Sequence, residues 1–535
     1  MKALHRTIAR IAVLSGLLAA PRAAPLAAQE AERAVFVVRV GRDTLGVESA
    51  SFFPSRATGV LRLRSPLVRV EQTITLTPSS GMARAVLSIA RGAHGDSALQ
   101  RLEITQRDDT VDVRVENASA PVPVSETRLP LPAGVVPFTN LSGLSIELIL
   151  RRARAIGRDT ATVRMLLGSG QVLPATVVWT VADSAVISIA GVSLRARTDR
   201  LGRFLGAFVP MQGLFIDRLP GDSPVAAWAP GATSYAAPAG APYAAQDVTF
   251  RTPSGIRLAG TLTVPAHRAG ARLPAVVLIT GSGAQDRDSA IPTIGEHRPF
   301  REIADTLSRR GIAVLRLDDR GVGGSDPGPP TVTTADFAND IRAAVAWLRA
   351  RADIDSARVG LVGHSEGGSI APMVAATDRR LRAIVLIAAP AKTGREIIAF
   401  QRRAAIDHDS TRTPAQRDSL FVESTRAADS LFAQSAWMQF FRDYDPVPTA
   451  RRVRTRTLIL HGETDRQVTA DQARALAIAM RTAGNARVTL RTFPRLNHLL
   501  IDDPSGDPRG YIALHPQRVR KDLLGVLADW LAGTL

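Results

Sequence analysis

Cysteine is absent from the 535-residue sequence, and lysine is nearly so. Without cysteine the chain can have no disulfide bond, thiol nucleophile, cysteine-ligated metal or lipid-anchored N-terminal cysteine. The absence does not decide the compartment, because exported proteins can fold without disulfides. Lys2, Lys392 and Lys521 are the only lysines among 67 basic residues, so nearly all of the positive charge is carried by arginine.

Blocks of like charge are also missing, although the formal net charge is +18. A net charge of this size could attract nucleic acid or an anionic membrane. The arginines, however, are scattered along the whole chain, with no run of about five or six like charges. This scatter is typical of a base-composition bias, and we predict no nucleic-acid partner.

After the N-terminus, no uncharged apolar stretch is long enough to span a bilayer. The N-terminus itself carries basic residues, then the short apolar stretch Ile11–Ala20, then small residues that end at Ala28. This order predicts a secretory signal peptide over residues 1–28, with a retained anchor as the alternative. We therefore expect an exported protein, periplasmic or extracellular, with no membrane span after signal cleavage. The sequence does not indicate an oligomeric state.

The length predicts two or more domains, because 535 residues exceed one ordinary core. Between residues 33 and 218 apolar and polar residues alternate, as in Val111–Glu116, which is the pattern of an antiparallel sheet with one buried face. We predict an all-β domain here, formed by a strongly curved sheet or a sandwich. It holds no catalytic constellation and could serve structure alone, cradle an apolar ligand or shield the rest of the chain. Residues 219–245, rich in proline, glycine, alanine and serine, predict a linker.

From residue 246 to residue 535, predicted strands alternate with predicted helices. Ala275–Ile279 and Ile312–Leu317 are apolar runs typical of buried strands, and Phe300–Arg310 between them suits a helix. Such alternation predicts an α/β class domain with a parallel, doubly wound sheet, whose sites lie at the carboxyl ends of the strands. Residues 391–450 interrupt the pattern with polar, helical sequence. We expect either a lid over the site or a solvated excursion with no gating role.

The segment Arg358–Gly368 carries the clearest motif. Val359–Val362 predicts a buried strand, Gly363-His-Ser-Glu-Gly367 follows at once, and a helix is predicted from Ser369. A strand, G-x-S-x-G and a helix in this order form a nucleophile elbow. The two glycines leave room for neighbouring backbone at a strained turn. We therefore predict that Ser365 is a nucleophile whose hydroxyl stands clear of the sheet.

A serine hydroxyl needs a base within hydrogen-bond reach and a carboxylate that fixes the tautomer of that base. In folds with this elbow the chain order is serine, acid, histidine. Asp465 follows a predicted strand that ends at Leu460, and His498 follows the predicted strand Val488–Phe493. We predict that Ser365, Asp465 and His498 act together.

Other residues compete for these roles. Glu463 could be the acid in place of Asp465. His461 could be taken for the base, but it leads the acid loop and more readily packs or caps there. His515 lies nearer the last predicted helix and suits a helix start. His498 could also be an ordinary surface histidine.

Acyl transfer also needs two N–H donors for the oxyanion. The Glu366 N–H follows the serine at the positive end of a helix. The second donor is expected in the loop Thr280–Asp288, where glycines let the backbone turn inward; Ser282 is the first choice and Gly283 the next. No P-loop lysine follows these glycines, so we predict no phosphate site, and no metal or cofactor.

Six motifs between residues 246 and 535 stand out: Gly281–Asp288, Asp319–Ser325, Gly363–Gly368, Phe441–Pro446, His461–Asp465 and Leu496–Leu499. Together they resemble the α/β-hydrolases, and more narrowly the bacterial esterase branch called serine aminopeptidase-like. The resemblance implies an α/β-hydrolase fold with a helical cap, and a carboxylic-ester hydrolase with Ser365 as nucleophile, Asp465 as orienting acid and His498 as base. The β domain lies outside the resemblance.

We therefore expect an exported serine hydrolase, in the first place a carboxylesterase, that cleaves a small-molecule ester through an acyl-enzyme. The first alternative is a serine aminopeptidase or other peptidase. It would need an acidic pocket for a free amine, of which Glu302 and Asp445 give no clear sign. An alternative of another class is an exported ligand-binding protein with an inactive hydrolase domain.

Overall fold

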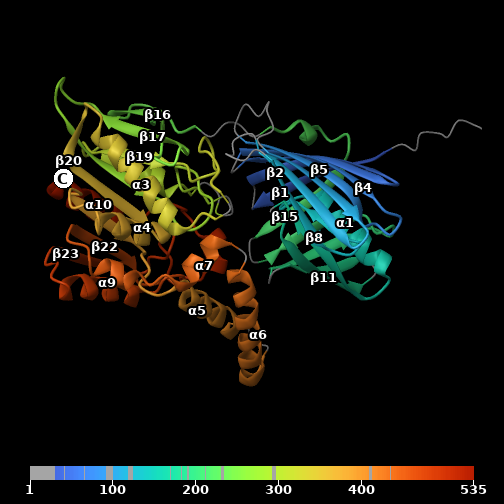
Figure 1. The fold of residues 1–535 in the computed structure, drawn as a ribbon. Helices are drawn as coiled ribbons and strands as arrows, with labels where there is room; N and C mark the ends of the chain where they lie inside the picture. Colours follow the sequence, from blue (N-terminus) through green and yellow to red (C-terminus); the bar gives the residue numbers. More distant parts are fainter. Residues whose placement is uncertain are drawn as a thin grey trace, which may run out of the picture.

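The computed structural model describes residues 31–535, apart from 41–42, 65–66, 92–99, 118–123, 169, 182, 190–191, 211–212, 230–233, 292–293, 295–296, 330, 409–411 and 434. The predicted signal peptide, residues 1–28, lies outside the described residues. Figure 1 shows two regions side by side, each built on its own sheet. Within the described part of the chain, no helix is both long enough and apolar enough to cross a bilayer.

The N-terminal region is one curved, almost entirely antiparallel sheet (Figure 1). The order of hydrogen-bonded strands across the sheet runs from β8 to β1 and continues from β15 to β9. The first and last strands, β1 and β15, therefore pair in the middle of the sheet. The 15 strands found among the described residues are β1 (Glu32–Val40), β2 (Asp43–Phe53), β3 (Arg56–Arg64), β4 (Leu67–Leu76), β5 (Met82–Arg91), β6 (Gln100–Arg107), β7 (Thr110–Asn117), β8 (Val124–Pro130), β9 (Val136–Phe138), β10 (Thr160–Leu167), β11 (Val172–Val181), β12 (Ser184–Ile189), β13 (Val192–Thr198), β14 (Phe204–Val209) and β15 (Leu214–Pro220).

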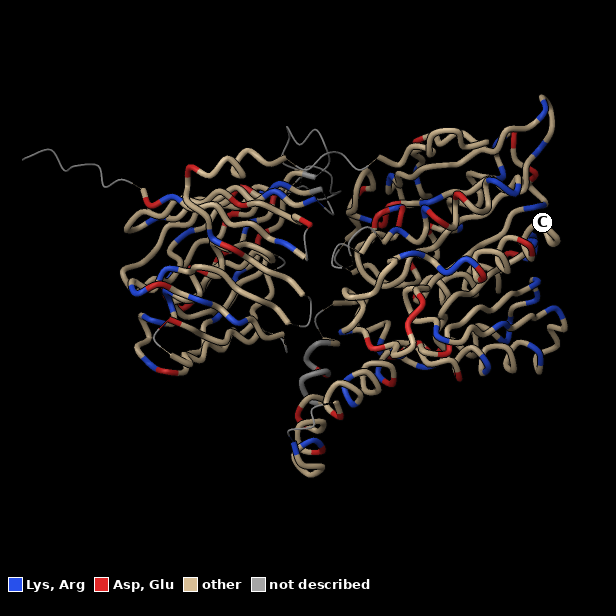
Figure 2. Tube along the Cα trace, turned by 180° about the vertical axis from the view of Figure 1, so that it is seen from behind, with Lys and Arg blue, Asp and Glu red and all other residues tan. Residues whose placement is uncertain are grey.

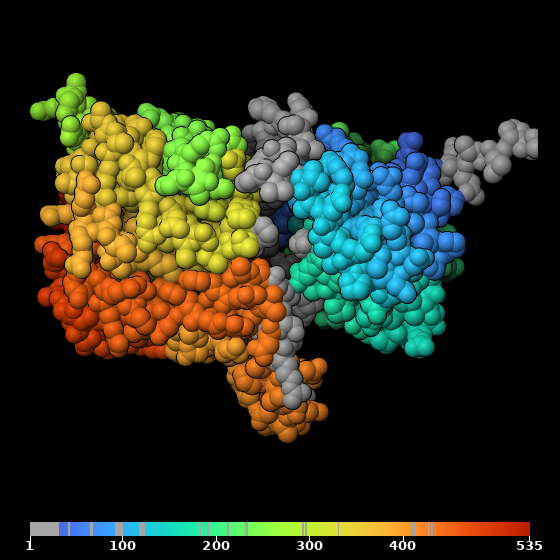
Figure 3. Space-filling view, in the orientation of Figure 1, coloured from blue at the N-terminus to red at the C-terminus, as the bar shows by residue number. Residues whose placement is uncertain are grey.

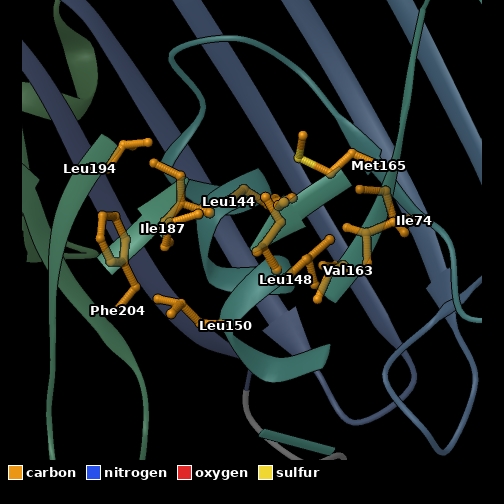
Figure 4. Close-up of a cluster of buried hydrophobic side chains, with 14 of the residues drawn as sticks. Ile74, Leu144, Leu148, Leu150, Val163, Met165, Ile187, Leu194 and Phe204 are labelled. Carbon is orange, nitrogen blue, oxygen red and sulfur yellow. The ribbon is translucent and has the colours of Figure 1, made fainter. Parts of the chain in front are cut away.

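The prediction of an all-β domain is wrong in one respect, because the helix α1 (Gly143–Ile156) lies in the core of this region. Leu144, Leu148 and Leu150 of α1 pack among side chains from the surrounding strands, as Figure 4 shows. Gly143 has no room for a side chain, since a Cβ there would lie 2.2 Å from the Phe36 ring. The region is therefore β-rich, with a buried helix inside the curved sheet.

A buried carboxylate holds the start of α1. Glu48 Oε2 accepts a hydrogen bond from the Leu144 N–H at 3.0 Å, and its Oε1 accepts from Ser142 Oγ at 2.8 Å and Gln72 Nε2 at 2.7 Å. These bonds pair a backbone N–H that a helix start leaves free. Burial raises the pKa of Glu48 to about 6, although the hydrogen bonds favour the charged form.

The C-terminal region confirms the predicted α/β class. Its eight-stranded sheet has the order β16-β17-β19-β18-β20-β21-β22-β23 within the described residues. The pairs β16–β17 and β17–β19 are antiparallel, and the remaining pairs are parallel. The strands are β16 (Tyr243–Arg251), β17 (Arg257–Pro265), β18 (Leu273–Ile279), β19 (Ala313–Leu317), β20 (Ile354–His364), β21 (Ala383–Ile387), β22 (Arg456–Gly462) and β23 (Val488–Phe493).

Helices cover both faces of this sheet, each over its own hydrophobic core. On one face lie α3 (Thr334–Arg349), α4 (Glu366–Ala375) and α9 (Ala470–Thr482). On the other lie α2 (Pro299–Ser308) and α10 (Lys521–Thr534). Apolar residues on two sides explain why β18, β20 and β21 are almost continuously buried, as expected for parallel strands.

Among the described residues between β21 and β22, the stretch 391–450 forms four helices: α5 (Gly394–Asp407), α6 (Pro414–Phe432), α7 (Ala436–Asp443) and α8 (Pro446–Ala450). α5 begins with a capping box between Thr393 and Glu396. In Figure 1, α6 projects away from the body of the molecule, whereas α7 lies close to α3. α5 buries only Gly394 and Ile397, and no residue of α7 is fully buried.

The two regions are joined by more than the linker. Ile512 lies in the short helix η4 (Pro508–Ala513) of the C-terminal region but packs against the core of the N-terminal region. A Cβ at Gly213 would lie only 2.5 Å from Ile512 Cδ1. Within the linker, Tyr235 Oη donates to Asp286 Oδ2 at 3.1 Å. Figure 3 shows the two regions side by side in space-filling form.

Basic and acidic residues are mixed over both regions, as Figure 2 shows. Many arginines lie against carboxylates: Arg114 pairs with Glu126 at 2.8 Å and Arg320 with Asp340 at 2.6 Å. Exposed pairs of the first kind contribute little to stability. The arginines that form such ion pairs occur in both regions, so the positive charge is not concentrated in one of them.

Candidate active site

Ser365 lies at the sharp turn between β20 and α4. Its backbone has φ 54° and ψ −116°, and a positive φ is strained for a residue that has a side chain. The Ser365 N–H donates to the Ile387 carbonyl at 2.9 Å, and the Ser365 carbonyl accepts from the Gly368 N–H at 2.8 Å. These bonds hold the turn at the carboxyl edge of the sheet, where the elbow motif predicted it.

The glycines of the motif are required by close backbone contacts. A Cβ at Gly363 would lie 2.0 Å from the Gly367 carbonyl oxygen, and a Cβ at Gly367 would lie 2.2 Å from the Ile279 carbonyl oxygen. Both obstacles are backbone atoms, so neither can rotate out of the way. The helix can start directly after the nucleophile only because these two side chains are missing.

The structure brings Asp465 and His498 to the Ser365 hydroxyl. His498 Nε2 lies 3.1 Å from Ser365 Oγ, and His498 Nδ1 lies 2.7 Å from Asp465 Oδ2. The three residues follow β20, β22 and β23, so strand ends at one edge of the same sheet position all of them. With its Nδ1–H donated to the carboxylate, the imidazole presents Nε2 as an acceptor for the serine proton.

Asp465 stays charged although it is buried. Burial disfavours its carboxylate, but the interactions with His498 and His461 and the hydrogen bond from the Val468 N–H together outweigh burial, so the pKa of Asp465 lies below its usual value. Asp465 Oδ1 accepts from the N–H groups of Gln467 at 2.8 Å and Val468 at 2.9 Å. Both carboxylate oxygens are therefore occupied, which fixes the one that faces His498.

The competing residues lie outside this arrangement. Glu463 is exposed, and its Oε1 accepts from Thr492 Oγ1 at 2.7 Å. His461 Nε2 donates to the Val468 carbonyl at 2.7 Å, so this ring supports the acid loop. His515 is exposed and precedes α10 by several residues, so its expected place at a helix start is wrong.

The two predicted oxyanion donors, Ser282 and Glu366, line the same cavity as Ser365. Glu366 is the first residue of α4, where the N–H groups have no acceptor within the helix. Ser282 follows β18 and is exposed. Its neighbour Gly281 approaches the nucleophile, since a Cβ there would lie 3.2 Å from Ser365 Cβ. These positions are compatible with the predicted roles.

Asp319 fixes the loop that contains Ser282. Its Oδ1 accepts from Thr280 Oγ1 at 2.6 Å, and its Oδ2 accepts from the Gln285 N–H at 2.9 Å. Burial raises the pKa of Asp319 to about 8, against both hydrogen bonds. In the sequence Asp319 stands out only as part of a motif, because its partners lie more than thirty residues earlier in the chain.

A cavity of about 480 Å³ lies beside Ser365. Its lining is largely apolar and includes Ile291, Ile294, Ile397, Ile398, Trp437, Met438, Phe441, Val468, Leu499 and Leu500. Helices α5 and α7 of the inserted stretch supply five of these side chains. Among the described residues that line the cavity, Glu366 alone carries a carboxylate. An apolar group could therefore be held next to the nucleophile.

The C-terminal region is similar in sequence to known proteins. Residues 294–505 match the family described as serine aminopeptidase, S33. The C-terminal region is thus similar to the serine aminopeptidase-like α/β-hydrolases. The resemblance predicted from the motifs is thereby confirmed. The match includes Ser365, Asp465 and His498, whereas Ser282 and the N-terminal region lie outside it.

The hydrolase region is similar to proteins with different descriptions. It is 30% identical over 282 residues to the esterase EstD of Thermotoga maritima, covering 51% of this chain and 65% of EstD. It is 26% identical over 293 residues to the uncharacterized peptidase YuxL of Bacillus subtilis, covering 53% of this chain and 38% of YuxL. The chain thus spans less than two thirds of either relative. A solved esterase of Pyrococcus furiosus superposes with a TM-score of 0.39 and 16% identity, over 57% of this chain and 96% of that one.

Proposed function

We propose that the protein hydrolyses carboxylic esters through an acyl-enzyme formed on Ser365. The proposal rests on one observation. His498 Nε2 lies 3.1 Å from Ser365 Oγ, and His498 Nδ1 lies 2.7 Å from Asp465 Oδ2. A hydroxyl, an imidazole and a carboxylate at these distances can act as nucleophile, general base and orienting acid.

In the first half-reaction, Ser365 Oγ attacks the ester carbonyl carbon while His498 Nε2 takes the hydroxyl proton. The N–H groups of Ser282 and Glu366 stabilise the oxyanion. The bond to the alcohol oxygen then breaks, and His498 gives its proton to the leaving alcohol. In the second half-reaction, His498 takes a proton from water as the water attacks the acyl carbon. The acid is released, and the proton returns to Ser365.

The helices α5 to α8 act as a cap in this proposal, and the cavity beneath them takes the acyl chain. A volume of about 480 Å³ with an apolar lining favours a small or medium acyl group. The similarity to EstD, which is described as an esterase, supports ester hydrolysis.

A peptidase is the second candidate, favoured by the family description and by the similarity to YuxL. An aminopeptidase must hold a free ammonium group, which calls for a carboxylate in the cavity. Glu366 is the one carboxylate among the described lining residues, and its Oε1 already accepts two hydrogen bonds. Glu302 and Asp445 are not among the lining residues. These observations favour an ester over a peptide.

We further propose that residues 1–28 are removed on export and that the mature protein acts in the periplasm or outside the cell. It would then consist of the β-rich domain at 33–218, the linker at 219–245 and the hydrolase domain at 246–535. N-terminal sequencing of the exported protein should begin near Gln29. An intact N-terminus on the exported protein would favour a retained anchor instead.

The catalytic assignment is tested with Ser365→Ala. We expect kcat/KM for p-nitrophenyl butyrate to fall by about 10³-fold or more, with an unchanged circular dichroism spectrum. A fluorophosphonate probe should label Ser365 in the wild-type protein and leave the variant unlabelled. Undiminished turnover by Ser365→Ala would contradict the proposal. Faster cleavage of aminoacyl p-nitroanilides than of esters would favour the peptidase, and an unlabelled, inactive wild type would favour the ligand-binding alternative.

A further inference from the structure

The side chain of Glu366 connects three segments around the nucleophile. Its Oε1 accepts from Thr334 Oγ1 at 2.6 Å and from Trp437 Nε1 at 2.8 Å, and the Ser282 side chain lies near the same carboxyl group. Thr334 begins α3, Trp437 belongs to α7, and Ser282 lies in the loop after β18. We call these four residues the Glu366 junction.

The centre of the Glu366 junction is buried, since Glu366 is only 7% exposed and Thr334 is also buried, whereas Trp437 is half-buried and Ser282 is exposed. Burial raises the pKa of the Glu366 carboxyl group, whereas its interactions with Thr334, Trp437 and Ser282 oppose that rise. An indole N–H can only donate, so Trp437 needs an acceptor at this place. Loss of the carboxyl group would leave the donors of α3 and α7 without a partner in a site partly closed to water.

Trp437 also forms part of the cavity wall. Its ring stacks on Phe441 with 5.7 Å between centroids and an angle of 6°, and both rings line the cavity. The hydrogen bond from the indole to Glu366 is thus a direct link between this aromatic wall and the residue that follows the nucleophile. Ser282, whose side chain lies near the same carboxyl group, belongs to the loop that is expected to supply the second oxyanion donor.

We propose that the Glu366 side chain is a positioning group that holds the α7 wall and the Ser282 loop in one arrangement, and so determines which acyl chain lengths the site accepts. The inference rests on the proposed function. Two effects follow from it. Breaking the bond to Trp437 frees the wall and weakens binding of long acyl chains, whereas removing the carboxyl group also disturbs the oxyanion donors and slows all esters.

The test uses p-nitrophenyl acetate, butyrate and octanoate with the variants Trp437→Phe, Glu366→Leu and Glu366→Gln. We expect Trp437→Phe to raise KM for the octanoate about fivefold more than for the acetate. Glu366→Leu should lower kcat for all three esters by about 10- to 100-fold. Glu366→Gln keeps an acceptor oxygen, so it should recover most of that loss. Trp347→Phe, in α3 and outside the cavity lining, is the matched control and should change no constant.

A double variant tests whether the residues act as one unit. Because Glu366→Leu already breaks the bond to Trp437, Glu366→Leu/Trp437→Phe should lose little more than Glu366→Leu alone. If Glu366→Leu does not fold, the same cycle with Ser282→Ala and Trp437→Phe applies, since Ser282 is exposed and its N–H is kept.

Additive losses in the double variant, or an equal effect of Trp437→Phe on all three esters, would overturn the inference while leaving the proposed function intact. A wild-type protein that hydrolyses no ester and is not labelled at Ser365 would overturn both.

Discussion

His364 donates a hydrogen bond from Nε2 to the carbonyl oxygen of His498 at 2.9 Å, and the centroids of the two rings are 5.0 Å apart. The residue before the nucleophile therefore holds the backbone of the base. Burial and, to a lesser extent, the nearby His498 lower the pKa of His364 to about 3. The His364 ring is thus neutral at physiological pH, with its proton on Nε2.

We expect His364→Phe to lower kcat for p-nitrophenyl butyrate about tenfold and to change KM less, because the base loses the donor that fixes its backbone. Steady-state kinetics measures both constants. The exposed His515 provides the control, since His515→Phe should change neither constant. A normal kcat in His364→Phe would show that the hydrogen bond has no part in positioning His498.

Asp465 and Glu463 offer a matched pair of acidic substitutions. Asp465→Asn should lower kcat by about 10³- to 10⁴-fold, because an amide cannot hold the Nδ1–H tautomer as the carboxylate does. Glu463→Gln should leave kcat unchanged, since Glu463 is exposed and bonded to Thr492. A larger loss in Glu463→Gln than in Asp465→Asn would reverse the assignment of the acid.

Gly367→Ala should destabilise the protein, because its Cβ would lie 2.2 Å from the Ile279 carbonyl oxygen. We expect the free energy of unfolding to fall by about 2–3 kcal/mol, measured by urea denaturation. The control is Gly525→Ala in α10, where nothing lies within 4 Å of the added Cβ. Since alanine is the better helix former, this variant should gain about 1 kcal/mol. Equal stability of the two variants would contradict the steric account of the elbow.

Glu48 should make stability depend on pH through the N-terminal region. Its pKa is raised from 4.5 to about 6 in the folded protein. The stabilisation is therefore fully present below about pH 4.5 and is lost as the pH rises through about 6. A difference of about 1.5 between the two pKa values corresponds to about 2 kcal/mol.

Urea denaturation between about pH 4 and pH 7 tests this dependence. The unfolding free energy of the wild type should fall by about 2 kcal/mol relative to Glu48→Gln, which cannot titrate. Glu126→Gln, at an exposed position in β8, should follow the wild-type curve. Parallel curves for wild type and Glu48→Gln would mean that Glu48 titrates alike in the folded and unfolded protein.

The positions of Ser365, Asp465 and His498 could be predicted because each follows a recognisable strand, and the ends of parallel strands meet at one edge of a sheet. The helix α1 could not be predicted in the same way. Every residue in the first two turns of α1 is buried, so burial is not limited to one face of the helix. A short segment that is buried on all sides shows no helical periodicity, and its sequence can indicate a buried strand as well as a helix.

The side-chain roles of Glu366 and Asp319 were also beyond the sequence pattern. Glu366 meets Thr334 and Trp437, which are 32 and 71 residues away. Asp319 meets Thr280 at a separation of 39 residues. No short-range sequence pattern predicts these hydrogen bonds, because the packing of α3, α7 and the loop after β18 brings the partners together.

Tyr511 lines the cavity, and the next residue, Ile512, is partly buried and packs against the core of the β-rich region. Excising the first half of the chain to obtain a minimal enzyme would leave Ile512 facing water and would release the backbone that carries Tyr511. Such a fragment could keep Ser365, Asp465 and His498 and still have a cavity of altered shape. No described residue of the β-rich region lines the cavity, yet this region contacts the residue that follows Tyr511.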